Sequence, residues 1–177
     1  MKKLKLNIAA SIDGFIARSD GDIDWLMEFP NPSKEKQGNK EFSESVDTLI
    51  MGGRTYYDFL CRDIIMPYKE KKTYVVSRNP LDDKGDIHFI TENIIETVSK
   101  LKEENGKDIW LVGGGELIGI LLNEGLIDEM TITYIPVILG KGISLFPNIK
   151  ETESNWKFIE SKTFANGAVK LSYRKAD

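Results

Sequence analysis

The stretch Ile109-Trp110-Leu111-Val112-Gly113-Gly114-Gly115-Glu116 is an apolar run that ends in three glycines and continues as a helical pattern. A second stretch, Leu49-Ile50-Met51-Gly52-Gly53-Arg54-Thr55, has the same form. The first turn of a helix presents unpaired backbone N–H groups and the positive end of the helix dipole, which suits a phosphate. Glycine lets an anion approach that backbone closely and permits a positive φ angle. Two such turns predict a ligand with phosphates at more than one place, such as a dinucleotide.

The rest of the chain alternates between strand and helix patterns. The segments expected to be strands are Leu4–Ala10, 48–51, Thr73–Ser77, Ile87–Thr91, Asp108–Val112 and Ile127–Ile135. Helices are expected at about 40–46 and at Thr55–Cys61, Glu92–Glu104 and Gly115–Asn123, and residues 17–38 are expected to be loop-rich. The last two strands, Trp156–Phe164 and Ala168–Arg174, flank Asn166-Gly167, a two-residue hairpin signal. The pattern predicts an α/β fold with a mixed sheet, helices on both faces and a C-terminal antiparallel hairpin.

Length and composition favour one domain over residues 1–177, because 41% of the residues are hydrophobic and can form a substantial core. The formal net charge of -4 argues against a nucleic-acid surface, which would show clustered basic charge. No stretch approaches the ~20 apolar residues that a membrane span needs. One cysteine and one histidine predict neither a disulfide framework nor a metal site. We therefore expect a cytoplasmic protein that binds neither nucleic acid nor membrane.

Three motifs, in this order along the chain, resemble the dihydrofolate reductase superfamily. They are Asn7-Ile8-Ala9-Ala10-Ser11-Ile12-Asp13-Gly14-Phe15-Ile16-Ala17, Ile50-Met51-Gly52-Gly53-Arg54-Thr55-Tyr56 and Val112-Gly113-Gly114-Gly115. The Ser-x-Asp-Gly turn, Pro136-Val137-Ile138-Leu139-Gly140-Lys141-Gly142 and Leu145-Phe146-Pro147 are similar to one branch, which contains the reductase domain of the bifunctional riboflavin-biosynthesis protein. The motifs cover nearly the whole chain. The resemblance implies a dihydrofolate-reductase-like fold with a mostly parallel sheet, and NADPH as cofactor.

The resemblance also implies which residues bind NADPH. They are Ala10, Ile16, Gly53, Arg54, Thr55, Ser77, Arg78, Val112, Gly114, Gly115, Glu116 and Leu117. Ala10 and Ile16 would lie beside the nicotinamide, and the first glycine turn with its arginine would contact the adenosine-side phosphates. The residues after the middle strand would meet the 2′-phosphate, and the triple glycine would bend under the pyrophosphate. We expect the Glu116 backbone to bind while its carboxylate points to solvent.

Several of these residues have a structural alternative. Arg54 could cap or salt-bridge a surface helix, and Arg78 could be a solvated turn residue. The adjacent tyrosines Tyr56-Tyr57 are expected to pack in the core rather than to stack on a ligand. Next to the glycines, the ligand role is the stronger interpretation for Arg54, whose planar guanidinium suits a phosphate.

The substrate side departs from the folate pattern that the resemblance implies. One carboxylate is expected in the pterin pocket, but counting back from Met51-Gly52 reaches Lys36 to Lys40, a window without an acid. The candidate catalytic residues are therefore Asp24, Glu41 and Thr133, and the candidate substrate-binding residues are Asp13 and Trp25. Thr133 could equally be an ordinary strand residue, and an Asp-Gly turn needs no catalytic role.

These features predict an NADPH-dependent reductase that transfers a hydride to a C=N or C=O group of an unidentified small molecule. One alternative is a module that binds NADPH or another nucleotide without turnover. A second is a doubly wound domain for a different phosphate ligand, which is disfavoured because the chain has no Gly-Lys-Ser/Thr P-loop. The resemblance further implies a homodimer, and the C-terminal hairpin offers an edge for pairing, although its charged residues could equally guard that edge.

Overall fold

The computed structural model describes residues 1–30, 40–62, 70–151 and 153–176. The strands of its large sheet are β1 (Leu4–Ser11), β3 (Val46–Gly52), β4 (Lys72–Val76), β5 (Ile87–Ile90), β6 (Asp108–Gly113), β7 (Glu129–Ile135), β9 (Trp156–Thr163) and β10 (Val169–Lys175). Two short strands, β2 (Phe15–Ala17) and β8 (Ile143–Ser144), pair separately. The helices are α1 (Asp24–Met27), α3 (Gly53–Cys61), α4 (Ile94–Glu103) and α5 (Gly115–Asn123), and residues 40–44 are also helical.

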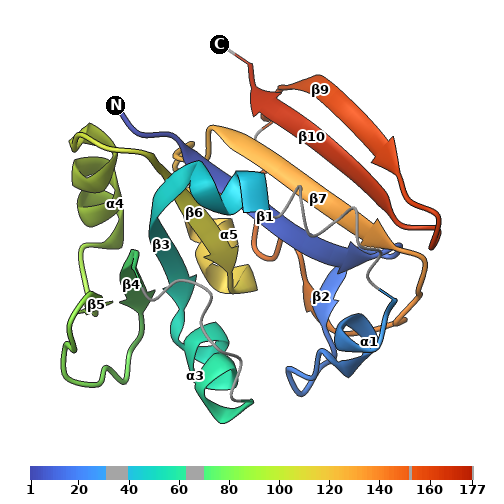
Figure 1. The fold of residues 1–177 in the computed structure, drawn as a ribbon, viewed down its shortest axis with the longest axis horizontal. Helices are drawn as coiled ribbons and strands as arrows, with labels where there is room; N and C mark the ends of the chain where they lie inside the picture. The colour runs from blue at the N-terminus through green and yellow to red at the C-terminus, as the bar shows by residue number, and fades with distance from the viewer. Residues whose placement is uncertain (31–39, 63–69, 152, 177) are drawn as a thin grey trace.

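The strands of the large sheet lie in the order β5-β4-β3-β6-β1-β7-β10-β9 (Figure 1). The strands from β5 to β7 in this order are all parallel, and β10 is antiparallel to both β7 and β9. The sheet is therefore mixed and mostly parallel, and it ends in an antiparallel hairpin, as the sequence predicts.

Three details differ from the sequence prediction. The hairpin turn has three residues, 165–167, because Phe164 N–H bonds Ala168 O at 2.9 Å outside them. Gly167 supplies a positive φ of 88°, and the Asn166 amide reaches out of the turn to donate to Pro30 O at 2.6 Å. The segment expected to be loop-rich contains the short helix α1, and the small β2–β8 sheet was not predicted either.

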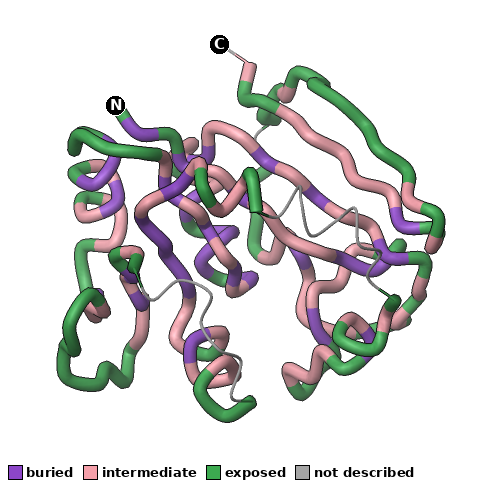
Figure 2. Tube along the Cα trace, viewed as in Figure 1, coloured by how far each residue is buried: buried purple, intermediate pink, exposed green. Residues whose placement is uncertain are grey.

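Helices cover both faces of the large sheet. On the back face, defined by Leu6, Leu111 and Ile132, the apolar sides of α4 and α5 pack in the main core. On the front face, defined by Ala9, Trp110 and Thr133, α1 and α3 contribute Trp25 and Tyr56 to two smaller apolar clusters. Figure 2 shows the resulting pattern: burial is concentrated in the central strands and their helices, whereas the edge strand β9 is largely exposed.

The chain connections leave in opposite directions from two neighbouring central strands, β3 and β6. The connection after β3 runs through α3 to β4 on one side, and the connection after β6 runs through α5 to β7 on the other side. In open α/β sheets, such a switch point leaves a crevice at the carboxyl ends of the strands, where ligands bind. Both glycine turns of the sequence lie at this point.

Candidate cofactor and substrate site

The two glycine turns are in contact with each other. A Cβ atom added to Gly114 would lie 3.4 Å from both the N and Cα atoms of Gly52. Gly113 and Gly114 have φ angles of 149° and 98°, in a region that other residues rarely adopt. Glycine is therefore required here by the path of the chain, whether or not a ligand binds.

The helices that follow these turns begin without side-chain caps. Gly52 is the N-cap of α3 and Gly114 is the N-cap of α5, and neither makes a side-chain capping hydrogen bond. The first backbone N–H groups of each helix, at 53–55 and at 115–117, therefore lack intrahelical acceptors. Two positive helix ends side by side form an arrangement that can hold two phosphate groups.

The end of β4 joins the same edge. A Cβ on Gly53 would come within 2.7 Å of Ser77 Oγ, so this glycine is also needed for close packing. The Ser77 hydroxyl hydrogen-bonds both the N–H and the carbonyl of Asn79, at 3.1 and 3.0 Å. The structure thus brings Ser77 beside the start of α3, as the predicted cofactor role requires.

The charged residues at this edge differ in their partners. Arg78 Nη2 donates to Glu116 Oε2 at 3.0 Å, so the Glu116 carboxylate does not simply point to solvent. Both side chains remain open to water, with 87% and 75% of their surfaces exposed. Arg54 is exposed and has no hydrogen bond or ion pair with the described residues. Its Cδ lies near Gly21, in the loop that precedes α1. Arg54 is therefore the cation best placed to receive a ligand here.

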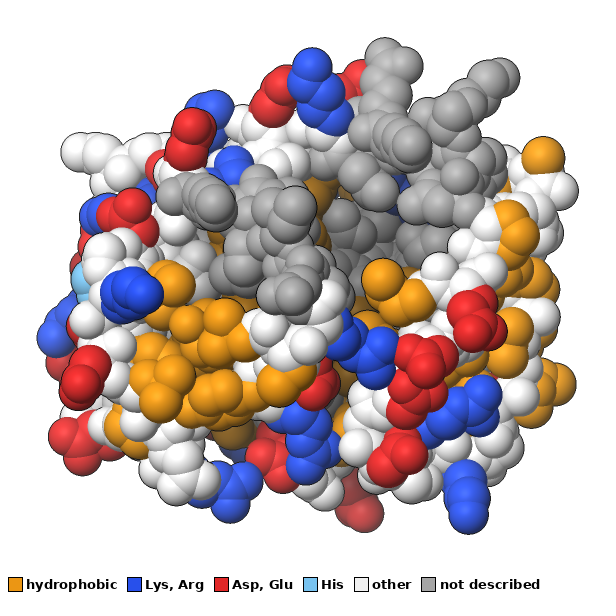
Figure 3. Space-filling model, turned by 60° about the horizontal axis from the view of Figure 1, so that its bottom comes forward, with side chains coloured by type: hydrophobic (Ala, Val, Ile, Leu, Met, Phe, Trp, Pro, Cys, Tyr) orange, Lys and Arg blue, Asp and Glu red, His pale blue; other side chains and the backbone are white. Residues whose placement is uncertain are grey.

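The pairing of β1 with β6 stops before the carboxyl ends of the two strands, at the edge of the sheet where the glycine turns lie. It contains only the pairs from Leu4↔Ile109 to Leu6↔Leu111, while β1 continues beside β7 as far as Ser11. Figure 3, which turns this end forward, shows a depression between the part built on α3, β4 and β5 and the part built on α1 and β2. The predicted cofactor residues Ala10, Ile16 and Val112 lie on the strands that border this opening, and Ala10 is fully buried.

Asp13 is held by donors of the chain itself. Its Oδ1 accepts from the Ser11 hydroxyl at 2.6 Å and from Leu139 N–H at 3.2 Å, and its Oδ2 accepts from Gly140 N–H at 2.7 Å. The Ser11 hydroxyl, together with the two amides, holds the pKa of the Asp13 carboxyl below its ordinary value. These contacts fasten the turn after β1 to the 136–140 segment, so Asp13 has a structural role, and its substrate-binding role stays a prediction.

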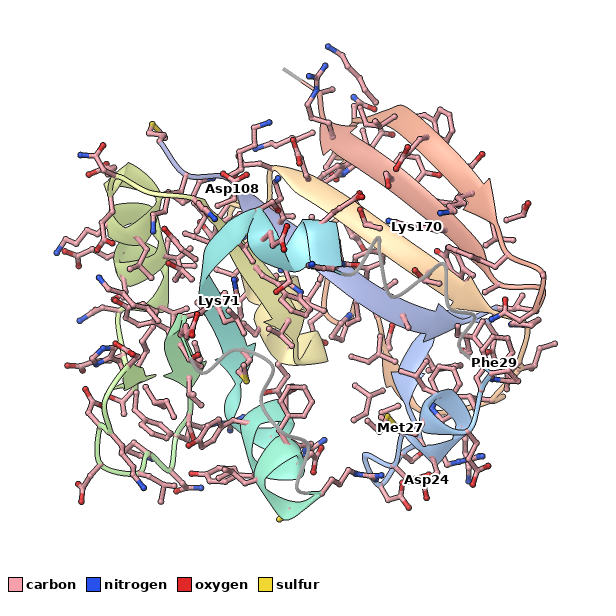
Figure 4. The ribbon with its side chains drawn as sticks, viewed as in Figure 1. Asp24, Met27, Phe29, Lys71, Asp108 and Lys170 are labelled. Carbon is pink, nitrogen blue, oxygen red and sulfur yellow. The ribbon has the colours of Figure 1, made fainter. Side chains whose placement is uncertain are left out.

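The two candidate acids lie at opposite ends of the central strands. Asp24 Oδ1 accepts from Arg62 Nη1 at 2.6 Å, just beyond the end of α3, and Figure 4 shows Asp24 at the lower end of α1. Glu41 is exposed on the 40–44 helix, which directly precedes the amino end of β3. The structure therefore does not bring Asp24 and Glu41 together. Residues 36–39, most of the window expected to hold a pocket acid, lie outside the described residues.

Thr133 and Trp25 lie on the front face. Thr133 pairs with Ala9 on β1 and with Lys170 on β10, and its hydroxyl has no hydrogen bond with the described residues. Trp25 is only 7% exposed and packs in a cluster that includes Ala9, yet its indole Nε1 has no hydrogen-bond partner among the described residues. A buried donor of this kind requires an explanation, such as a water or a ligand.

Sequence reasoning missed two charged residues of this region. Arg62 joins the end of α3 to the start of α1 and the segment before it, by donating to Asp22 and Asp24 at 3.1 and 2.6 Å. Lys170 lies beside Thr133. Neither residue stands next to a motif, and only the tertiary arrangement reveals its position. Within the described ranges, no group of three or more His, Cys, Asp or Glu could hold a metal ion, and no helix is long and apolar enough to cross a membrane.

Comparison with known proteins gives consistent matches. The model of the RibD C-terminal domain matches residues 2–170. Protein YwjB of Bacillus subtilis (strain 168) is 40% identical over 177 residues, which cover 99% of both chains. A crystal structure from Shewanella sp. PV-4, whose name refers to riboflavin biosynthesis, is 30% identical with a TM-score of 0.86, over 99% of both chains. Dihydrofolate reductase from Enterococcus faecalis, complexed with NADP(H), shares the fold with a TM-score of 0.70 at 18% identity, over 99% of this chain and 97% of that one.

Proposed function

This chain belongs to the RibD C-terminal domain family, and on that premise we propose that it is an NADPH-dependent reductase acting on a C=N or C=O group of a small molecule. The observation that carries the proposal is the contact between two uncapped helix N-termini at the switch point of the sheet. Family membership gives the reaction class. The residues of the site bear on the substrate.

The residues at the glycine edge fit NADPH. The N–H groups at 53–55 and 115–117 would bind phosphate oxygens, and Arg54 would add a charged donor without losing a partner among the described residues. Arg78 can reach a 2′-phosphate only by sharing its guanidinium with Glu116 or by leaving it. We therefore assign the larger part of the preference for NADPH over NADH to Arg54.

The open end of the β1–β6 ladder would receive the nicotinamide, with Ala10 and Ile16 beside it. When bound, this group supplies the hydride, and the protein supplies orientation and electrostatics. Thr133 would donate or accept a hydrogen bond at the reacting group, because its hydroxyl is uncommitted among the described residues. Trp25 would give its buried N–H to the substrate or to an ordered water.

The site does not support efficient reduction of dihydrofolate. That reaction needs a proton at a ring nitrogen, and a positioned acid typically contributes ~10²–10⁴-fold. Asp24 is committed to Arg62, and Glu41 lies at the other end of β3. We expect weak or no turnover of dihydrofolate, and a different small molecule as the substrate.

Cofactor titration tests this proposal. Protein fluorescence would be followed on addition of NADPH, NADH and ATP, and NADPH oxidation would then be measured with dihydrofolate, quinones, imines and aldehydes. Tight NADPH binding with turnover of one class supports the reductase. NADPH binding without any turnover would favour the alternative, a nucleotide-binding module. Binding of ATP without NADPH would favour a module for another nucleotide, and absence of binding to NADPH, NADH and ATP would refute both proposals.

The proposal extends to a cytoplasmic homodimer. The edge strand β9 exposes Phe158 and Ile159, at 59% and 52%, along an open side of the sheet. Lys157, Glu160 and Lys162 lie on the same strand and would either pair across a dimer or prevent one. Light scattering distinguishes these cases, because a mass of 20.0 kDa at all concentrations would contradict the dimer.

A further inference from the structure

Two lysines face each other across the C-terminal hairpin. Lys170 of β10 lies directly opposite Lys162 of β9 in the antiparallel register. Like charges in such positions destabilise a strand pair. The Lys162 ammonium lies 5.2 Å from the centroid of the Phe164 ring. Lys170 is half-buried and forms no ion pair or hydrogen bond with residues of the described ranges. The repulsion between these two ammonium groups destabilises the strand pair, and a bound anion would offset it.

The register places Lys170 on the front face, next to Thr133, the residue proposed to contact the reacting group. Thr131 and Ser172 oppose each other on β7 and β10, and their hydroxyls are 3.2 Å apart, which fixes the face of these alternate positions. Two residues away, Thr133 and Lys170 form the next pair on that face. Thr133 in turn opposes Ala9, which packs in the Trp25 cluster.

The acidic groups near this pair do not neutralise it. Glu160 lies opposite Ser172, diagonal to Lys170, and makes no ion pair with it. Farther along the same face, Glu129 is bonded to Lys3 at 2.6 Å and lies 3.6 Å from the ammonium of Lys5. Thr133 and Lys170, paired across β7 and β10, therefore present two donors side by side, a hydroxyl and an ammonium.

On the basis of the proposed function, we propose that Lys170, supported by Lys162, binds an anionic group of the substrate and places it beside Thr133. The group is a carboxylate or a phosphate, both of which match an ammonium and a hydroxyl donor. Lys170 is then a specificity-determining residue that selects negatively charged electrophiles over neutral ones. The like-charge pair, costly for the sheet by itself, is relieved when the anion binds.

Backbone amide NMR of the full chain can locate this site. The protein would be saturated with NADP⁺ to fill the glycine edge, and then titrated with sodium acetate, sodium phosphate and neutral acetamide. We expect saturable shifts at Thr133 and Leu171 with at least one anion and none with acetamide. The anion with the lower Kd identifies the group as carboxylate or phosphate.

Variants make the assignment specific. Lys170→Met should weaken anion binding by about tenfold or more, the scale of one charge-assisted contact, and Lys170→Arg should retain it. Lys72→Met, at an exposed lysine on β4, is the matched control and should bind as wild type. Absence of saturable shifts at Thr133 with either anion, or unchanged binding by Lys170→Met, would overturn the inference. If NADP⁺ fails to shift Gly53 and Gly115, the proposed function fails separately, and the anion shifts still report on the lysine site by their location.

Discussion

The two sides of the crevice are built from different chemistry. The glycine side, made of 52–55 and 113–117, relies on the backbone: positive φ angles, close approach of two turns and uncapped helix ends. The proposed substrate side, made of Ala9, Trp25, Thr133 and Lys170, relies on side chains from four separate elements. A backbone-built site tolerates little change, whereas a side-chain-built site can change its chemistry while the fold persists. One fold can in this way keep its ligand-binding backbone while its side chains change the substrate.

The largest expected effect is on the glycine side. Gly114→Val should lose both NADPH binding and part of the stability of the fold, because a positive φ costs a β-branched residue ~1–2 kcal/mol or more and the new Cβ meets the Gly52 backbone at 3.4 Å. Gly85→Val is the matched control, since Gly85 also has a positive φ, of 60°, but has open space around it. Circular dichroism and NADPH titration would be compared for both. A folded Gly114→Val protein with wild-type NADPH affinity would remove the triple glycine from the site.

A smaller effect is expected at the charged rim of the same side. Arg54→Ala should weaken NADPH about tenfold, the scale of one charge-assisted contact, and leave NADH nearly unchanged. Arg54 has no partner among the described residues, so thermal stability should not change. Arg78→Ala should cost less, because Arg78 is shared with Glu116. Equal loss of both cofactors in Arg54→Ala would instead place this arginine at the pyrophosphate.

The glycine side could be predicted from the sequence because its signals are local. A strand that ends in glycines and continues as a helix fixes both the turn and the free N–H groups within a few neighbouring residues. The same holds for the sheet, whose predicted strands and C-terminal hairpin are confirmed to within about two residues. The exceptions are physical as well: a four-residue helix such as α1 has too little periodicity to be recognised.

The substrate side could be predicted only in part. The sequence makes Trp25 and Thr133 candidates, but Lys170 carries no motif and is brought beside Thr133 only through pairing of β10 with β7. The pairing of Asp24 with Arg62 also depends on residues 38 positions apart. Such contacts are set by tertiary packing, which local patterns do not encode.

The substrate side can be tested at a single hydroxyl. Thr133→Val keeps the branched shape and removes the group proposed to contact the reacting atoms. We expect kcat/KM to fall several-fold, with NADPH affinity unchanged, since one neutral hydrogen bond contributes roughly 0.5–1.5 kcal/mol. Thr131→Val is the control, because its hydroxyl is already paired with Ser172. An equal effect of both variants on kcat/KM would show that Thr133 acts through the sheet rather than at the substrate.

The smallest expected effect is on the stability of an Asp13 variant, and it distinguishes a structural role of Asp13 from a role in substrate binding. The pKa of this carboxyl is lowered in the folded state, chiefly by the Ser11 hydroxyl. Its contribution to stability is therefore complete above the unfolded pKa of about 3.9 and is lost as the pH falls through the folded value. Asp13→Asn should thus be less stable than wild type at pH 7, and the difference should shrink at pH 3.

Urea unfolding at several pH values measures this difference. Asp82→Asn, at an exposed aspartate without hydrogen bonds to the described residues, serves as the control. Unchanged stability of Asp13→Asn with a raised KM would assign Asp13 to substrate binding, the role for which the sequence makes it a candidate. Loss of stability with an unchanged KM would assign it to the turn that joins β1 to the 136–140 segment. In that case the Asp13 carboxylate is committed to Ser11, Leu139 and Gly140, and the proposed binding of an anionic substrate depends on Lys170 and Thr133.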